Sequence, residues 1–235
     1  MKDTINFLLA GVGGQGTILA SDILANVGLA AGYQAKQAEV HGMSQRGGSV
    51  ISHVRWGKTV HSPLVGAGET DVFLAFEKAE ALRNINSLRP LSGPHRPGVL
   101  PGEHPECSDT LALINLEAIL PVSVTSGDQT YPSDDHLRTT FARLTHLASY
   151  IDGPGIARSL GNPRVTNIVL LGALSFLMEQ QGLVGVELHA ETWLKVISER
   201  VPARTVDLNH QAFLKGRQMA VTPTQLRART PGVFR

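Results

Sequence analysis

The sequence of 235 residues has little cysteine, few aromatic residues and almost no net charge. Its only cysteine is Cys107, so the chain alone cannot form an internal disulfide or a four-thiolate zinc or iron–sulfur site. A formal net charge of +1 gives no electrostatic reason to expect nucleic acid or an anionic membrane as a partner. The apolar run near Met1 is too short for a secretory signal or a membrane span. We therefore expect a cytoplasmic protein, since low cysteine content is typical of a reducing compartment.

The most informative feature present is a short apolar run that ends in a glycine-rich turn. Residues 5–10 predict a buried strand, and residues 17–31 predict a helix because apolar side chains recur at three- and four-residue spacing. The glycines between them fit G-x-G-x-x-G, which permits positive φ angles and close backbone approach. The helix start would direct free N–H groups at an anion such as phosphate. The candidate cofactor-binding residues of this turn are Gly11, Gly13, Gly14, Gln15 and Gly16.

A polar loop follows the second expected strand, residues 33–40. Because ligands of doubly wound sheets bind beyond the carboxyl ends of the strands, we expect this loop to lie near the glycine turn. Its candidate binding residues are His41, Gly42, Met43, Ser44, Gln45, Arg46 and Gly47. His41 and Arg46 are also candidate catalytic residues, since imidazole can transfer a proton and guanidinium can pair with phosphate or carboxylate. The residue types alone equally allow a structural loop whose polar groups bind its own backbone.

The remaining pattern predicts an α/β protein with three layers, α/β/α, and a Rossmann-like, mixed but mostly parallel sheet. Residues 49–56 alternate with period two and follow the preceding strand too closely for a helical crossover, so an antiparallel strand is expected. Other strands are expected at residues 71–76, 110–115 and 149–152, and helices at 77–86, 134–145, 165–178, 188–200 and 205–216.

We expect one domain, residues 1–216, which includes a proline-rich surface insertion at 90–107. The arginine-rich segment 217–235 is expected to be a flexible tail, with an arm laid on a partner chain as the alternative. Four possible metal ligands gather in the insertion, but their spacing matches no zinc pattern, and we expect no metal site. They are His95, His104, Glu106 and Cys107.

Two other interpretations of the glycine turn remain open. Glu39 follows it at the distance at which dinucleotide enzymes place the acid that binds a ribose hydroxyl. The chain could therefore be a free-standing NAD(P)-binding protein, either a dehydrogenase or a regulatory sensor. Alternatively, the turn holds no ligand and only packs its helix on the sheet.

Several motifs together resemble the gamma-type domain of the 2-oxoacid:acceptor oxidoreductases, particularly of the members directed to indolepyruvate. The resemblance covers most of residues 4–216, and the octet 41–48 is far more specific than the glycine fingerprint. The motifs are Gly-Val-Gly-Gly-Gln-Gly at 11–16, Glu-Val-His-Gly-Met-Ser-Gln-Arg-Gly-Gly-Ser-Val at 39–50, Ser62-Pro63, Asp71-Val-Phe-Leu-Ala-Phe-Glu77, Asn115, Pro121, Tyr131-Pro132, Gly161-Asn-Pro-Arg-Val-Thr-Asn167 and Asn209-His-Gln-Ala-Phe213.

The resemblance implies a subunit that is inactive alone and binds no cofactor tightly. It implies that thiamine diphosphate and iron–sulfur clusters belong to a partner alpha subunit, that coenzyme A is the co-substrate and that ferredoxin accepts the electrons. The implied reaction is the oxidative decarboxylation of an arylpyruvate such as indolepyruvate to its acyl-CoA. It also implies that residues 41–48 face the active site or the path of coenzyme A.

Overall fold

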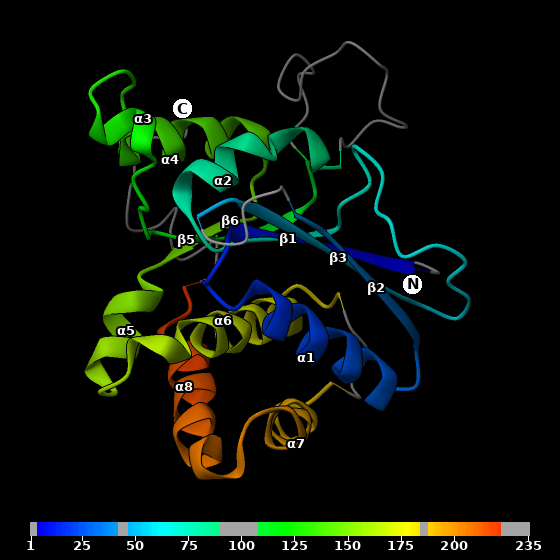
Figure 1. The fold of residues 1–235 in the computed structure, drawn as a ribbon. Coiled ribbons are helices and arrows are strands. Elements are labelled where there is room, and N and C mark those ends of the chain that lie inside the picture. Colours follow the sequence, from blue (N-terminus) through cyan, green and yellow to red (C-terminus); the bar gives the residue numbers. More distant parts are fainter. Residues whose placement is uncertain (1–3, 42–46, 90–107, 184–187, 222–235) are drawn as a thin grey trace.

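The computed structural model describes residues 4–41, 47–89, 108–183 and 188–221. These residues form one mixed sheet of six strands in the order β2-β3-β1-β4-β5-β6, with helices on both faces (Figure 1). The strands are β1 (Thr4–Val12), β2 (Gln34–His41), β3 (Ser49–Gly57), β4 (Val72–Ala75), β5 (Leu111–Asn115) and β6 (Ala148–Ile151).

The pairing of the strands confirms a mixed, mostly parallel sheet. β1, β4, β5 and β6 run parallel to one another, whereas β3 is antiparallel to both β1 and β2. The alternation along residues 49–56 buries Val54 and Trp56 on one face and leaves His53 and Arg55 half-buried on the other. The antiparallel strand expected there is confirmed.

The helices divide between the two faces of the sheet (Figure 1). One face carries α1 (Thr17–Ala30), α5 (Gly153–Ser159), α6 (Thr166–Gln180), α7 (Ala190–Arg200) and α8 (Val206–Met219). The other face carries α2 (Lys78–Arg83), α3 (Val122–Thr125) and α4 (Asp134–Leu144). Short 3-10 turns span Ile85–Ser87, Pro163–Val165 and Ala203–Thr205. Among the described helices, none is long and apolar enough to cross a membrane.

Helix α6 is buried on almost every side because it lies between the sheet and α8. Two glycines allow the helices to cross at very short range. A Cβ on Gly172 would lie 2.0 Å from the carbonyl oxygen of Phe213, and one on Gly216 would lie 2.0 Å from that of Val169. This close crossing fixes the position of α6 against α8. Asn167, near the start of α6, lies against the glycine turn.

Several boundaries differ from those expected from sequence. β1 continues through Gly11 to Val12, so Gly11 lies in the strand. The helix expected at 77–86 ends at Arg83, because the side chain of Asn84 donates to the carbonyl oxygen of Glu80 at 2.9 Å and the chain turns. Helix α8 continues to Met219, three residues beyond the expected domain end. The proline-rich insertion and the tail from residue 222 lie outside the described residues.

Candidate functional site

The predicted site residues that the structure describes lie at one edge of the sheet. Strands β1, β4, β5 and β6 all end at this edge because they are parallel. Antiparallel β3 begins there, and β2 ends there. The glycine turn, both ends of the polar loop and the residues after β4 and β5 therefore meet on the same side of the molecule, as expected for ligand sites in α/β sheets.

Backbone hydrogen bonds join the glycine turn to the end of the polar loop. The amide of Gly13 donates to the carbonyl oxygen of Gly48 at 2.9 Å, and the amide of Gly47 donates to that of Gly13 at 3.4 Å. At the start of the loop, His41 is the last residue of β2 and pairs with Val50 of β3. The two ends of the loop are thus held beside the turn. Residues 42–46, including Arg46, lie outside the described residues.

The conformation of the turn explains the requirement for glycine at its last position. Gly16 has a φ of 78° and is the N-cap of α1, with no side-chain hydrogen bond to the cap. A Cβ there would lie 2.7 Å from Nδ2 of Asn167. In the structure, that nitrogen donates to the carbonyl oxygen of Gly16 at 3.4 Å. The buried Asn167 is therefore a hydrogen-bonding residue that ties α6 to the start of α1.

Gln15 bridges the ends of β1 and β4, whose following helices lie on opposite faces of the sheet (Figure 1). Its Oε1 accepts from the amide of Val12 at 2.8 Å. Its Nε2 donates to the carbonyl oxygen of Phe76 at 3.0 Å and to Oε2 of Glu117 at 2.9 Å. Sequence reasoning placed Gln15 among the ligand-binding groups, whereas in this structure both atoms of its amide contact protein groups. Gln15 fastens the turn to the ends of β4 and β5.

Sequence reasoning did not place the buried acidic residues of this edge among the candidate site residues, although Glu77 ends one of the motifs of the resemblance. Glu77 and Glu80 are 1% and 3% exposed. Glu80 accepts from Oγ of Ser49 at 2.6 Å and forms an ion pair with Arg83. Because Ser49 directly follows the octet, Glu80 anchors the point where the polar loop rejoins the sheet. The sequence feature that could have indicated them is the presence of two acidic residues, Glu77 and Glu80, soon after an apolar strand.

Asn115 and Tyr131 complete the polar network at this edge. Asn115 is fully buried, donates to the carbonyl oxygen of Phe76 at 2.8 Å and accepts from the amide of Gly153 at 3.0 Å. The hydroxyl of Tyr131 donates to Glu77. Burial and the neighbouring Glu77 carboxylate raise the pKa of Tyr131 well above its ordinary value, so the phenol remains a neutral donor.

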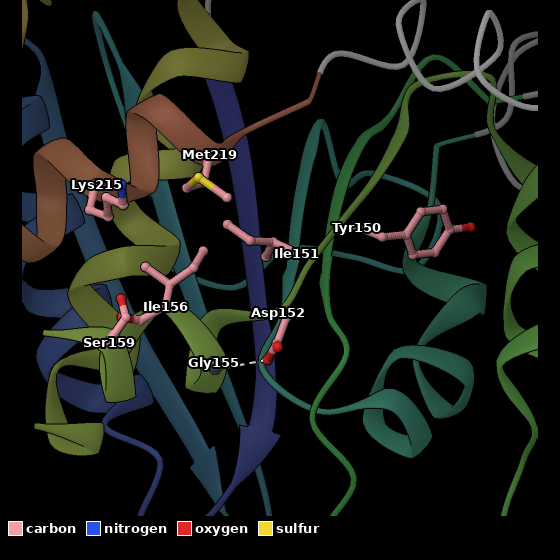
Figure 2. Close-up of a pocket in the computed structure, with 8 residues that line it drawn as sticks. All are labelled: Tyr150, Ile151, Asp152, Gly155, Ile156, Ser159, Lys215 and Met219. Atoms are coloured by element: carbon pink, nitrogen blue, oxygen red, sulfur yellow. Dashed lines mark hydrogen bonds between the residues drawn. The ribbon is translucent and has the colours of Figure 1, made fainter. Parts of the chain in front are cut away.

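A separate cavity of about 410 Å³ lies between β6, α5 and α8 (Figure 2). Its lining residues are Tyr150, Ile151, Asp152, Gly155, Ile156, Ser159, Lys215 and Met219. In Figure 2 the Tyr150 ring points away from the other labelled side chains, and Asp152 accepts from the amide of Gly155 at 2.8 Å. The predicted site residues are absent from this lining. Within the described part of the chain, no group of three or more His, Cys, Asp or Glu side chains could hold a metal ion.

Comparison with known proteins gives the same family over nearly the whole chain. Residues 6–219 match the family described as pyruvate ferredoxin/flavodoxin oxidoreductase. The chain is 37% identical over 212 residues to indolepyruvate oxidoreductase subunit IorB of Thermococcus kodakarensis, covering 90% of this chain and 93% of the relative. It is 34% identical over 218 residues to subunit IorB of Archaeoglobus fulgidus, covering 93% of this chain and 96% of the relative.

Solved structures share the fold. The gamma subunit of a keto/oxoacid ferredoxin oxidoreductase from Geobacter sulfurreducens superposes with a TM-score of 0.59 at 23% identity, covering 92% of this chain and 98% of that one. A 2-oxoglutarate:ferredoxin oxidoreductase from Magnetococcus marinus gives a TM-score of 0.64 at 22% identity, covering 94% of this chain but 31% of that longer one. The chain therefore belongs to the pyruvate ferredoxin/flavodoxin oxidoreductase family.

Proposed function

We propose that this chain is the subunit without iron–sulfur clusters in a thiamine-diphosphate-dependent 2-oxoacid:ferredoxin oxidoreductase. The proposed reaction is the oxidative decarboxylation of an arylpyruvate such as indolepyruvate to its acyl-CoA, with coenzyme A as co-substrate and ferredoxin as acceptor. The main support for this proposal is sequence similarity to relatives named as subunits of indolepyruvate oxidoreductase, which extends over at least nine-tenths of both chains. We propose that the complex works in the cytoplasm.

The cofactors are assigned to a partner alpha subunit on chemical grounds. A single cysteine cannot supply the thiolates that an iron–sulfur cluster requires. Thiamine diphosphate bound in the partner supplies the carbanion chemistry of decarboxylation. The contribution assigned to this chain is to complete the wall of that site, with the glycine turn and residues 41–47 as the facing surface. In this proposal His41 and Arg46 contact the anionic substrate or coenzyme A.

The arrangement of the sheet edge supports this role over free-standing dinucleotide binding. A dinucleotide enzyme presents the amides of its glycine turn to the diphosphate. Here the Gly13 amide bonds to Gly48, and the Gln15 side chain bonds to the ends of β1 and β4. Glu39, the acid that would bind the ribose, lies with its Oε1 3.4 Å from Oγ of Ser21 on α1. The groups that would bind NAD(P) thus already have partners within the chain itself.

Reconstitution with a panel of 2-oxoacids tests the proposal. This chain and its thiamine-bearing partner are co-purified and assayed for ferredoxin reduction with indolepyruvate, phenylpyruvate, pyruvate or 2-oxoglutarate. Mass spectrometry identifies the acyl-CoA product. We expect the arylpyruvates to be preferred and turnover to require coenzyme A. Preference for pyruvate or 2-oxoglutarate would contradict the substrate assignment, and micromolar binding of NAD(P) to the isolated chain would favour the alternative.

A further inference from the structure

A buried carboxylate clasps both ends of the segment between β5 and α4. Oε1 of Glu77 accepts from the backbone amide of Ile119 at 3.1 Å and also from the hydroxyl of Tyr131. Its Oε2 accepts from the amide of Glu80 at 2.9 Å, which fixes the carboxylate at the start of α2. One oxygen therefore ties together two residues that are twelve positions apart in the sequence. The segment between them is a closed loop with a rigid base.

The first part of this loop, next to its base, is apolar and exposed to solvent. The exposed fractions are 36% for Ile119, 53% for Leu120 and 82% for Val122. We call these three residues the apolar knob. Val122 begins the short helix α3, which lies on the same face of the sheet as α4 (Figure 1). Exposed apolar side chains clustered on a restrained loop, instead of scattered singly over a surface, indicate an interaction site.

The knob is continuous with the candidate functional site. Glu117, two residues before Ile119, accepts from Nε2 of Gln15 at 2.9 Å. The carbonyl oxygen of Glu117 also accepts from the amide of Lys78 at 3.1 Å. The base of the loop is thus hydrogen-bonded directly to the glycine turn. The knob, which begins at Ile119, therefore lies at the same edge of the sheet as the turn.

We propose that the apolar knob docks into an apolar recess of the thiamine-bearing partner subunit. This inference rests on the proposed function, because that function makes the sheet edge the face covered by the partner. The Glu77 clasp lowers the cost of docking, since the loop is ordered before the partner arrives. An Asp at the knob would carry an unpaired charge into the interface and weaken association strongly.

The test compares charged variants at two exposed apolar places, with Leu120 at 53% and Leu214 at 49% exposure as the matched pair. Val122→Asp and Leu120→Asp change the knob, whereas Leu214→Asp changes a residue that is 49% exposed on α8, on the opposite face of the sheet (Figure 1). Calorimetry with the thiamine-bearing subunit purified from the complex measures association, and thermal unfolding of each variant checks folding. We expect the knob variants to weaken association by at least about tenfold. Leu214→Asp should bind like the wild type.

The possible outcomes separate failure of the inference from failure of the proposed function. If knob variants with wild-type unfolding curves bind the partner normally, the docking assignment is overturned while the proposed function stands. If the wild-type chain neither binds nor activates the thiamine-bearing subunit, both are overturned. If the wild-type chain self-associates and Val122→Asp makes it monomeric, the occupant is a second copy of this chain and the assignment to the partner is wrong.

Discussion

Replacing Gln15 with glutamate should destabilise the sheet edge at neutral pH through charge repulsion. The two side chains have nearly the same shape, so one oxygen would still accept from Val12. The other oxygen would replace Nε2, which lies 2.9 Å from Oε2 of Glu117 and 3.0 Å from the carbonyl oxygen of Phe76. Two unit charges at that separation repel by about 6 kcal/mol at an effective dielectric of 20. Because Glu117 is partly exposed, we expect a smaller loss of unfolding free energy, about 2–4 kcal/mol.

The pH dependence identifies repulsion as the cause. Two neighbouring carboxylates raise each other's pKa in the folded state, so the folded variant binds a proton more readily than the unfolded chain. Its stability relative to wild type should be greatest below about pH 4.3, the unfolded value for glutamate, and should fall as pH rises through the raised folded pKa. Gln15→Ala loses the hydrogen bonds without adding charge and should cost about 2 kcal/mol independently of pH.

Urea unfolding of the isolated chain between pH 4 and pH 8 measures both effects. Gln37→Glu, at an exposed position of edge strand β2, is the matched control for an added charge. We expect the difference in stability between Gln15→Glu and Gln37→Glu to widen steadily as pH rises. Equal stability of the two variants at pH 7.5 would refute the assigned contact between Gln15 and Glu117.

Three further predictions concern the scaffold. Gly172→Ala should cost at least about 2 kcal/mol of unfolding free energy, because the new Cβ would lie 2.0 Å from the carbonyl oxygen of Phe213, and urea unfolding should show it. Burial lowers the pKa of His53, and its Nδ1 accepts from the amide of Val65, so the unfolded chain takes up a proton at higher pH than the folded chain. The unfolding free energy of the wild type should therefore fall as pH drops below 6.5. His53→Gln should lack this pH-dependent loss of stability. Gly16→Ala should cost about 1–2 kcal/mol because φ is 78°, and an unchanged melting temperature would contradict that conformation.

The sequence predicted the fold well where periodicity and glycine positions are strong. The antiparallel placement of β3 followed from its short connection, and the apolar period of residues 165–178 correctly predicted α6. The shorter helices α3 and α5 were missed, because four and seven residues carry too little periodicity to be recognised. Gly11 was assigned to the turn because its spacing fits the fingerprint. In the structure it lies in the strand, where a Cβ would meet Thr17 and Phe76 at under 3 Å.

The hydrogen-bond network of the site could not be predicted from sequence. The contact between Gln15 and Glu117 joins residues that are 102 positions apart, and no local pattern indicates it. The pairing of Glu77 with Tyr131 likewise depends on the tertiary path between β5 and α4. The general location of the site could be predicted from the sequence, because the carboxyl ends of parallel strands lie at one edge of the sheet. The binding roles of His41, Arg46 and the rest of the octet stay predictions.

The most direct test of the central claim is titration of the thiamine-bearing subunit with this chain during indolepyruvate-dependent reduction of ferredoxin. We predict no turnover by this chain alone and a saturable rise in rate that levels off at a fixed ratio of the two subunits. Full turnover by this chain alone, or a rate indifferent to its addition, would contradict its role as a required subunit.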